Sequence, residues 1–255
     1  MRYGICTGLE NAKLLEQMGY DYIEPSVTAA MNLDPERLDQ LVEDLKSLKI
    51  RCEAFNILFP KTMDLLGNTG EEELTDHLHK AMGLVQRLGG RVVVFGSGKC
   101  RRCPDSLSYG EAYKRLVKVY RLTGDIAAQY GITVVIEPLS RAETNMICTM
   151  AEGAILEADV NRANVSLLSD FYHVAANHDN IEDIETIKNF GHIHIASGNG
   201  RRYPLSEEGE RYAAFMRSLK KAGYDGRISI EGKTDDIRKD GPKALAFLKE
   251  LEERV

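Results

Sequence analysis

The feature that most constrains the fold is a regular alternation of strand-like and helix-like segments along the whole chain of 255 residues. Short runs rich in Val and Ile are each followed by a longer segment with helical spacing, and Gly, Pro or Asp residues mark the boundaries. The predicted strands lie at residues 2–6, 20–24, 51–57, 91–95, 132–136, 165–168 and 192–196, with an eighth directly after residue 226. The predicted helices lie near residues 9–18, 35–48, 71–88, 110–130, 149–158, 181–190, 207–222 and 242–252.

Eight strand–helix units of about 32 residues each predict an α/β protein with a single (β/α)8 TIM barrel, in which residues 1–255 form one domain. An open doubly wound sheet is the alternative, but such sheets usually carry five or six strands and a glycine-rich first turn. The first turn here, Thr7 to Leu9, contains one glycine. In a barrel, catalytic groups lie at the C-terminal ends of the strands.

Composition limits the compartment and the partners. A net charge of -6 argues against a nucleic-acid or anionic-membrane surface, and no apolar run approaches the roughly 20 residues of a membrane span. We see no signal peptide, and five cysteines, an odd number, fit free thiols in a reducing compartment, so we expect a cytoplasmic protein. Cys100 and Cys103 form a CxxC motif without a second such pair, and we expect no redox role for it. A homodimer and a homotetramer both stay open.

Four consecutive predicted strands end in a side chain that can bind a metal ion. Glu137 follows the fifth strand, where Pro138 cannot donate to the ladder, and Asp170, His194 and Glu231 end the next three. Because these ends face one mouth of a barrel, we expect the four groups to lie together. Three carboxylates and one imidazole form a hard, mostly oxygen site, for which we expect one divalent ion: Mn2+, with Mg2+, Co2+ or Zn2+ as alternatives.

Two further histidines lie near these strand ends. His192 and His194 are two residues apart on one strand, so both side chains point to the same face, and His192 lies deeper. We expect His192 to be a hydrogen-bonded core residue. His173 lies three residues after Asp170, close enough to the same mouth to hold a substrate oxygen or to move a proton.

The motifs at these strand ends, IEPLSRAETN, LLSDFYH, GHIHIASGNGRR and ISIEG, together with FGSG after the fourth strand, resemble a known family. They are similar to the sugar isomerase/epimerase barrels of the xylose-isomerase-like superfamily, and most of all to the D-tagatose 3-epimerase (ketose 3-epimerase) group. The resemblance covers the whole chain in strand order and is specific at the strand ends. It implies metal ligands at Glu137, Asp170, His194 and Glu231, and substrate contacts at Glu143, His173 and Arg201. It does not distinguish Arg201 from its neighbour Arg202.

The resemblance also implies a mechanism. A divalent ion chelates the carbonyl and an adjacent hydroxyl of a ketose, acidifies the C–H bond between them and stabilises the enediolate. Glu137 and Glu231, the expected catalytic pair, then remove the proton from one face and return it to the other, which is 3-epimerisation. An isomerase needs only one base and uses the same ligands, so this alternative stays open.

Three more positions are expected to contact the substrate. Glu24, Asn56 and Ser97 end earlier strands on the other side of the mouth, where sugar hydroxyl groups would lie. The stretch GSGKCRR, which begins at residue 96, could hold a phosphate through its N–H groups and basic side chains. Whether the sugar is free or phosphorylated stays open.

Two rival functions use the same kind of barrel. An endonuclease IV-like zinc phosphodiesterase needs further His and Glu ligands after the early strands and a basic groove for DNA. This chain is acidic, and Asn56 ends its third strand. A non-catalytic sugar- or metal-binding barrel would not need two glutamates at opposing strand ends. We therefore predict a metal-dependent sugar isomerase/epimerase that binds a small sugar and no nucleic acid or membrane.

Overall fold

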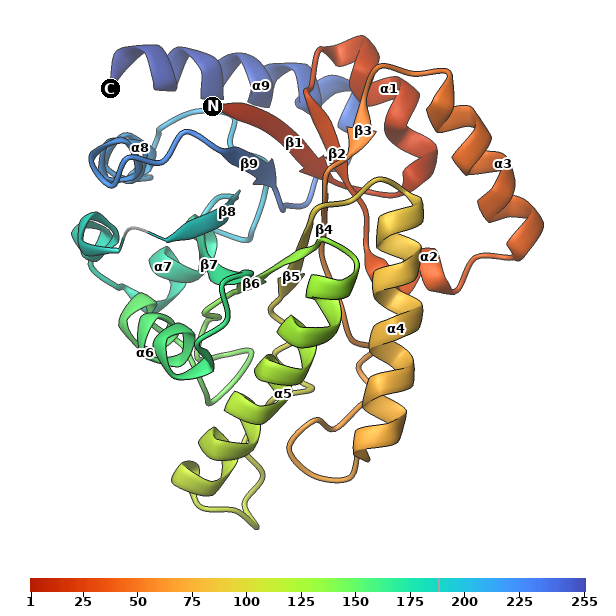
Figure 1. Cartoon of the computed structure of the whole chain (residues 1–255). Helices are drawn as coiled ribbons and strands as arrows, with labels where there is room; N and C mark the ends of the chain where they lie inside the picture. Colours follow the sequence, from red (N-terminus) through yellow and green to blue (C-terminus); the bar gives the residue numbers. More distant parts are fainter. Residues whose placement is uncertain (188) are drawn as a thin grey trace.

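The computed structural model describes residues 1–187 and 189–255, and its strands form one curved parallel sheet with helices around the outside (Figure 1). The strands follow each other in the order β3-β2-β1-β9-β8-β7-β6-β5-β4. Their bounds are Arg2–Cys6 (β1), Tyr22–Glu24 (β2), Arg51–Cys52 (β3), Ala54–Phe55 (β4), Val92–Phe95 (β5), Thr133–Ile136 (β6), Val165–Asp170 (β7), Phe190–Ile195 (β8) and Arg227–Ile230 (β9). Only Glu53 separates β3 from β4, so the two edges of the sheet meet in one short segment. The sheet is therefore a nearly closed barrel of eight positions, and the predicted TIM barrel is confirmed.

The third barrel position differs from its prediction. One strand was expected over residues 51–57, but Glu53 interrupts it, and its carbonyl oxygen accepts hydrogen bonds from the N–H groups of Arg91 and Val92. After Phe55 only an isolated bridge between Ser26 and Asn56 continues the pairing. The strand was placed correctly but predicted too long.

Several helices begin at a residue whose side chain caps the N-terminus. Asp34 caps the N-terminus of α3, and Ser108 and Thr149 form capping boxes at α5 and α6. The bounds are Leu9–Asn11 (η1), Ala12–Met18 (α1), Val27–Met31 (α2), Pro35–Lys46 (α3), Glu71–Arg87 (α4), Tyr109–Gln129 (α5), Met150–Val160 (α6), Phe171–Asn177 (α7), Ile181–Thr186 (η2), Tyr212–Lys221 (α8) and Ile237–Arg254 (α9). None of the described helices is both long enough and apolar enough to cross a bilayer.

Two helix predictions need correction, and two short helices were missed. The short helices α2 and α7 were not predicted, and the helix expected over residues 181–190 is the 3-10 helix η2 followed by β8. Residue 188, within that predicted helix, lies outside the described residues. The last helix begins at Ile237 rather than near residue 242, because the Asp236 side chain caps its N-terminus, and Pro242 lies inside the helix.

The interior of the barrel is layered, because alternate residues of each strand point inward. One buried cluster consists of Tyr22, Ala54, Val92, Val94, Val135 and Leu168. Gly4 leaves room for this packing, since a Cβ atom there would lie 2.4 Å from the ring of Tyr22. Four of these residues, Tyr22, Ala54, Val135 and Leu168, each lie two positions before a predicted site residue and so lie one layer below the mouth.

Candidate metal centre and active site

The four predicted metal ligands come together at the C-terminal mouth of the barrel. One donor atom from each of Glu137, Asp170, His194 and Glu231 lies within 4.8 Å of the others. His194 Nδ1 is 3.0 Å from Glu231 Oε2 and 3.4 Å from Glu137 Oε1. The four residues lie at or directly after the C-terminal ends of β6 to β9. These strands are neighbours in the sheet, so adjacent strand ends bring the four groups to one point.

A glycine on the neighbouring strand end leaves space for one of these carboxylates. A Cβ atom at Gly96 would lie 2.1 Å from Glu137 Oε2, which no real side chain allows. Any larger residue at position 96 would therefore displace the Glu137 carboxylate from the cluster.

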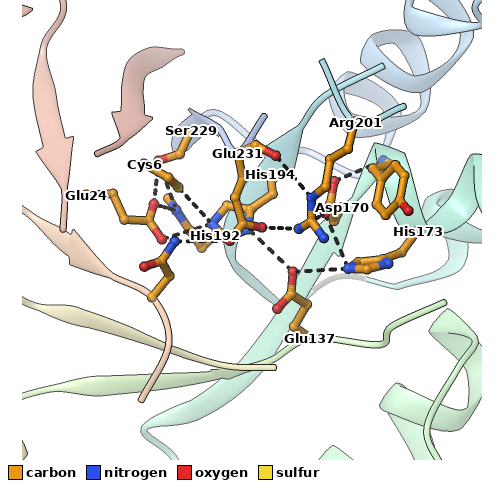
Figure 2. A network of polar contacts seen from close by, with 12 residues as sticks. Cys6, Glu24, Glu137, Asp170, His173, His192, His194, Arg201, Ser229 and Glu231 are labelled. Atoms are coloured by element: carbon orange, nitrogen blue, oxygen red, sulfur yellow. Dashed lines mark hydrogen bonds and ion pairs between the residues drawn. The ribbon is translucent and has the colours of Figure 1, made fainter. Parts of the chain in front are cut away.

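The orientation of His194 suits a metal ligand. Its Nε2 is 2.9 Å from Glu24 Oε1 in a fully buried contact, so Nε2 carries the proton and Nδ1 faces the carboxylates (Figure 2). A carboxylate behind a metal-binding imidazole is the usual way in which proteins fix the ring and its tautomer. His194 Nδ1 and Glu137 Oε1 are both buried and have no hydrogen-bond partner among residues 1–187 and 189–255. Since unpartnered buried polar atoms are costly, the pair fits a divalent cation between them.

The charges of the cluster are strongly coupled. Burial, together with the Glu231 carboxylate, raises the pKa of Glu137, and burial raises that of Asp170 to about 7 against the opposing effect of Arg201. Burial would also raise the pKa of Glu231, but His194 and Arg201 lower it to about 2. The two glutamates thus have pKa values displaced in opposite directions, which is the pattern of an acid and a base sharing one site.

The same carboxylates act on His194. Burial lowers the pKa of the imidazole, but Glu24 and Glu231 outweigh this effect and raise it well above its ordinary value. A cation at Nδ1 therefore has to displace a proton, and metal affinity should increase with pH.

Arg201, and not Arg202, turns into the mouth. The loop after β8 places Gly200 and Arg201 in left-handed backbone conformations, with φ of 79° and 54°. The Arg201 guanidinium lies 3.2 Å from Asp170 Oδ2 and 3.3 Å from Glu143 Oε1, and it also contacts Glu231. It lies 4.6 Å from the centre of the Tyr172 ring. Arg202 turns outward and pairs with Asp235 at 2.6 Å.

His173 approaches the cluster from α7. Its Nδ1 accepts a 2.9 Å hydrogen bond from the N–H group of Ser140, so the neutral ring carries its proton on Nε2. Nε2 faces Asp170 Oδ2 at 3.6 Å and Glu137 Oε1 at 3.8 Å, and it has no hydrogen-bond partner among the described residues. Burial and the nearby Arg201 lower the pKa of His173 to about 3. The ring is therefore a neutral donor aimed at the site.

The remaining predicted contacts divide into two groups. Asn56 and Glu143 line the cavity, and Asn56 Nδ2 donates a 3.0 Å hydrogen bond to Glu231 Oε1. Glu24, which was expected to touch the sugar, does not line this cavity. It is completely buried and bonded to His192, His194 and Ser229, so the substrate-contact prediction for Glu24 is corrected to a place behind the imidazole. His192 is the buried, hydrogen-bonded core residue that was predicted.

Two supporting features were missed by sequence reasoning. The backbone of Ser140 fixes His173, and no residue type signals such a contact. Arg101 is completely buried and donates to the carbonyl oxygens of Gly96, Glu137 and Met146 at 2.6, 2.8 and 2.5 Å. It thereby ties the loops after β5 and β6 together beside Glu137. Its position between two cysteines gave no signal of this role.

A cavity of about 870 Å³ opens above the cluster, within the usual range for small-molecule sites. Its lining includes Asn56, Glu137, Glu143, His173, Arg201 and Glu231. These six charged or polar side chains around a metal-competent centre suit a small polyhydroxylated ligand.

Comparison with known proteins agrees with this geometry. The L-ribulose 3-epimerase of Methylomonas sp. (strain DH-1) is 30% identical over 233 residues, which cover 86% of this chain and 76% of that protein. The crystal structure of a D-psicose 3-epimerase in the presence of D-fructose superimposes with a TM-score of 0.86 and 21% identity, covering 99% of both chains. The structure of the IOLI protein with a bound zinc atom superimposes with a TM-score of 0.76 and 22% identity, covering 100% of this chain and 99% of that one.

The two structures show the same fold, and the likeness to the Methylomonas relative supports an enzyme that acts on sugars as an epimerase or isomerase. The model of the xylose isomerase-like TIM barrel family matches residues 12–251. The chain belongs to the xylose isomerase-like TIM barrel family.

Proposed function

We propose that this protein is a divalent-metal-dependent ketose 3-epimerase that moves a proton between the two faces of carbon 3 through an enediolate. The observation that carries the proposal is the pair of glutamates, Glu137 and Glu231, which share one cluster of candidate metal ligands and both line the cavity. The named activity of the Methylomonas relative, 3-epimerisation of L-ribulose, supports the same chemistry.

Glu137, Asp170, His194 and Glu231 would hold the ion, for which we propose Mn2+, with Mg2+, Co2+ and Zn2+ as alternatives. When bound, a divalent cation supplies a Lewis acid that acidifies the C–H bond beside the carbonyl and offsets charge on the substrate oxygens. The IOLI protein, of the same fold, binds zinc.

The protein side chains would carry the proton. Glu137 follows β6 and Glu231 follows β9, and we propose that one carboxylate removes the carbon-bound proton and the other returns one to the opposite face. In the reverse reaction the roles exchange. His173 would donate from Nε2 to a substrate oxygen, while Arg201 and Glu143 would hold neighbouring hydroxyl groups.

The proposal is tested by solvent exchange in deuterated water. L-ribulose and D-fructose, incubated with protein and Mn2+, should gain deuterium at carbon 3 and form the 3-epimer. Glu137→Gln and Glu231→Gln should each reduce exchange by about a thousandfold, since each removes a proton-transfer group. Glu36→Gln, on the exposed side of α3, is the charge-matched control and should behave as wild type.

The other outcomes are equally informative. Deuterium at carbon 1 together with an aldose product would assign the protein as an isomerase. Because both glutamates are also candidate ligands, metal content is measured for each variant, and a variant that retains its ion but loses exchange supports the catalytic role directly. A protein that binds metal and sugar but exchanges no proton would be a binding barrel, and the proposal would be wrong.

A further inference from the structure

The half of the mouth that faces the metal-ligand cluster has a different charge. The candidate ligands end β6 to β9, whereas the loops after β4 and β5 form the facing half. These two loops place Lys61, Lys99 and Arg102 in the lining of the cavity. We call these three residues the cationic wall. The acidic residues of the lining, Glu137, Glu143 and Glu231, all belong to the other half, which also contributes Arg201 and Lys233.

The cationic wall is not neutralised by ion pairs within the described part of the chain. No carboxylate of residues 1–187 and 189–255 forms an ion pair with Lys61, Lys99 or Arg102. Asp64, the one acidic residue of the 59–70 loop, is not part of the cavity lining and accepts from the N–H group of Gly67 in its own loop. The chain has a net charge of -6, so these three cations without ion pairs stand out against its overall negative charge.

The wall is held by buried contacts between its two loops. The N–H group of Leu65 donates to the carbonyl oxygen of Cys100 at 2.9 Å, and Cys100 Sγ lies 3.3 Å from the carbonyl oxygen of Pro60. Cys100 and Arg101 are buried between Lys99 and Arg102, which are exposed. The backbone therefore fixes the positions from which the side chains of Lys99 and Arg102 extend.

The turn that carries Lys99 also offers uncharged donors. Ser97 has left-handed backbone, with φ of 44°, and its buried Oγ has no hydrogen-bond partner among the described residues. The N–H groups of Gly98 and Lys99 likewise donate to no acceptor in the described part of the chain. Free N–H groups in such a turn, beside cations, are a common arrangement for binding an anion.

We propose that the substrate is an anionic ketose, whose reacting carbons lie at the metal-ligand cluster and whose far end carries a phosphate or carboxylate group against the cationic wall. This inference rests on the proposed function, because it uses the cluster to orient the sugar. A phosphate dianion matches three cations and free N–H donors better than a single carboxylate charge does.

The test compares ketoses that are the same at the reacting end and differ at the far end. D-fructose, D-fructose 6-phosphate and D-fructuronate form one such series, and D-ribulose with D-ribulose 5-phosphate forms another. For solvent deuterium exchange, we expect kcat/KM to be at least about tenfold higher for the phosphorylated ketose, and the advantage to shrink as salt is added. A larger advantage for D-fructuronate would identify the anion as a carboxylate.

Substitutions assign the preference to the wall. In the triple variant Lys61→Gln, Lys99→Gln and Arg102→Gln, the ratio of kcat/KM for phosphorylated over free ketose should fall to about one, since the three cations that favour the phosphorylated sugar are removed. The control replaces Lys80, Lys114 and Lys118, exposed on α4 and α5 and outside the cavity lining, with Gln. Its ratio should equal that of wild type.

Failure of this inference and failure of the proposed function are distinguishable. Exchange that is equally fast with free and anionic ketoses, or a ratio that the triple variant leaves unchanged, overturns the inference and leaves the epimerase intact. If no ketose exchanges, calorimetric binding of D-fructose 6-phosphate against D-fructose decides. If binding requires the phosphate and is lost in the triple variant, the cationic wall binds the phosphate. If the two sugars bind equally, or neither binds, the inference is wrong.

Discussion

At the scale of single residues, the site depends on side chains that are held from behind. Glu24 contacts both His192 and His194, and its Oε2 also accepts from Ser229, which in turn contacts Tyr22. These groups fill the layer of the barrel below the candidate ligands. Although burial opposes its charge, the two imidazoles keep the pKa of Glu24 well below its ordinary value, so it stays ionised behind the candidate metal ligands.

Replacing Glu24 therefore tests the metal site without touching a candidate ligand. Glu24→Gln should weaken Mn2+ binding by about tenfold to a hundredfold, because the neutral amide no longer supports the His194 tautomer or its basicity. Calorimetric titration of metal-free protein measures this change. Ser229→Ala, which removes only one partner of Glu24, should change the affinity by less than about threefold. Equal affinities for wild type and Glu24→Gln would show that Glu24 has no such role.

The environment of His173 predicts how the rate depends on pH. Its pKa is lowered to about 3, so the ring is neutral at all pH values above about 4 and cannot produce a limb near pH 6.5 in the rate profile. We expect His173→Asn to reduce kcat/KM about a hundredfold, because a positioned donor is lost. The profile between pH 5 and 8 should keep its shape. A limb near pH 6.5 that is present in wild type and absent in the variant would contradict this assignment.

At the scale of strands and loops, the two ends of the barrel have separate tasks. The C-terminal ends carry the site, whereas at the other end Glu53 connects three barrel positions. Its carboxylate pairs with Arg2 at the start of β1 and with Arg227 at the start of β9, the latter at 2.7 Å. The same residue interrupts the third strand, so a local irregularity supplies a cross-barrel tie.

The tie predicts a dependence of stability on pH. Burial would raise the pKa of Glu53, but Arg2 and Arg227 lower it below the ordinary value of 4.5. A lowered carboxyl pKa adds stability above the pKa of the unfolded chain, and this contribution is lost as pH falls through the folded pKa. Glu53→Gln should lower the free energy of unfolding by about 1–2 kcal/mol at pH 7 and by much less at pH 3.

Urea unfolding at both pH values measures this difference. Glu43→Gln removes the partner of an exposed pair with Lys46 on α3 and should change stability by less than about 0.5 kcal/mol. If both variants lose the same stability at pH 7, or if the Glu53→Gln loss persists at pH 3, the tie does not act as described.

Periodicity and punctuation were enough to predict the barrel, because each strand is a short apolar run followed by a helix with its own cap or glycine stop. They could not predict α7, since Asp170 ends β7 and also caps α7, and its side chain accepts from the N–H group of Tyr172. Strand-end chemistry pointed to the four candidate ligands. The place of Glu24 was missed because a glutamate at a strand end looks the same whether it faces the ligand or another side chain.

At the scale of the whole molecule, the barrel brings together groups separated by up to 94 positions, from Glu137 to Glu231, in one small volume. Parallel strands all end at the same mouth, so one donor per strand is enough to surround an ion. The early strands then remain available for the substrate, and their loops carry the cationic wall. One half of the mouth would therefore hold the reacting carbons, and the other half would recognise the far end of the substrate.

Removal and restoration of the metal ion tests whether the strand ends form a catalytic metal centre. Protein treated with a chelator should lose proton exchange on its ketose, and Mn2+ should restore it with a break at one equivalent per chain. Asp170→Ala and His194→Ala should bind less than one equivalent and remain inactive. Exchange that continues in metal-free protein, or full binding of Mn2+ by both variants, would contradict the claim that these strand ends form the catalytic metal centre.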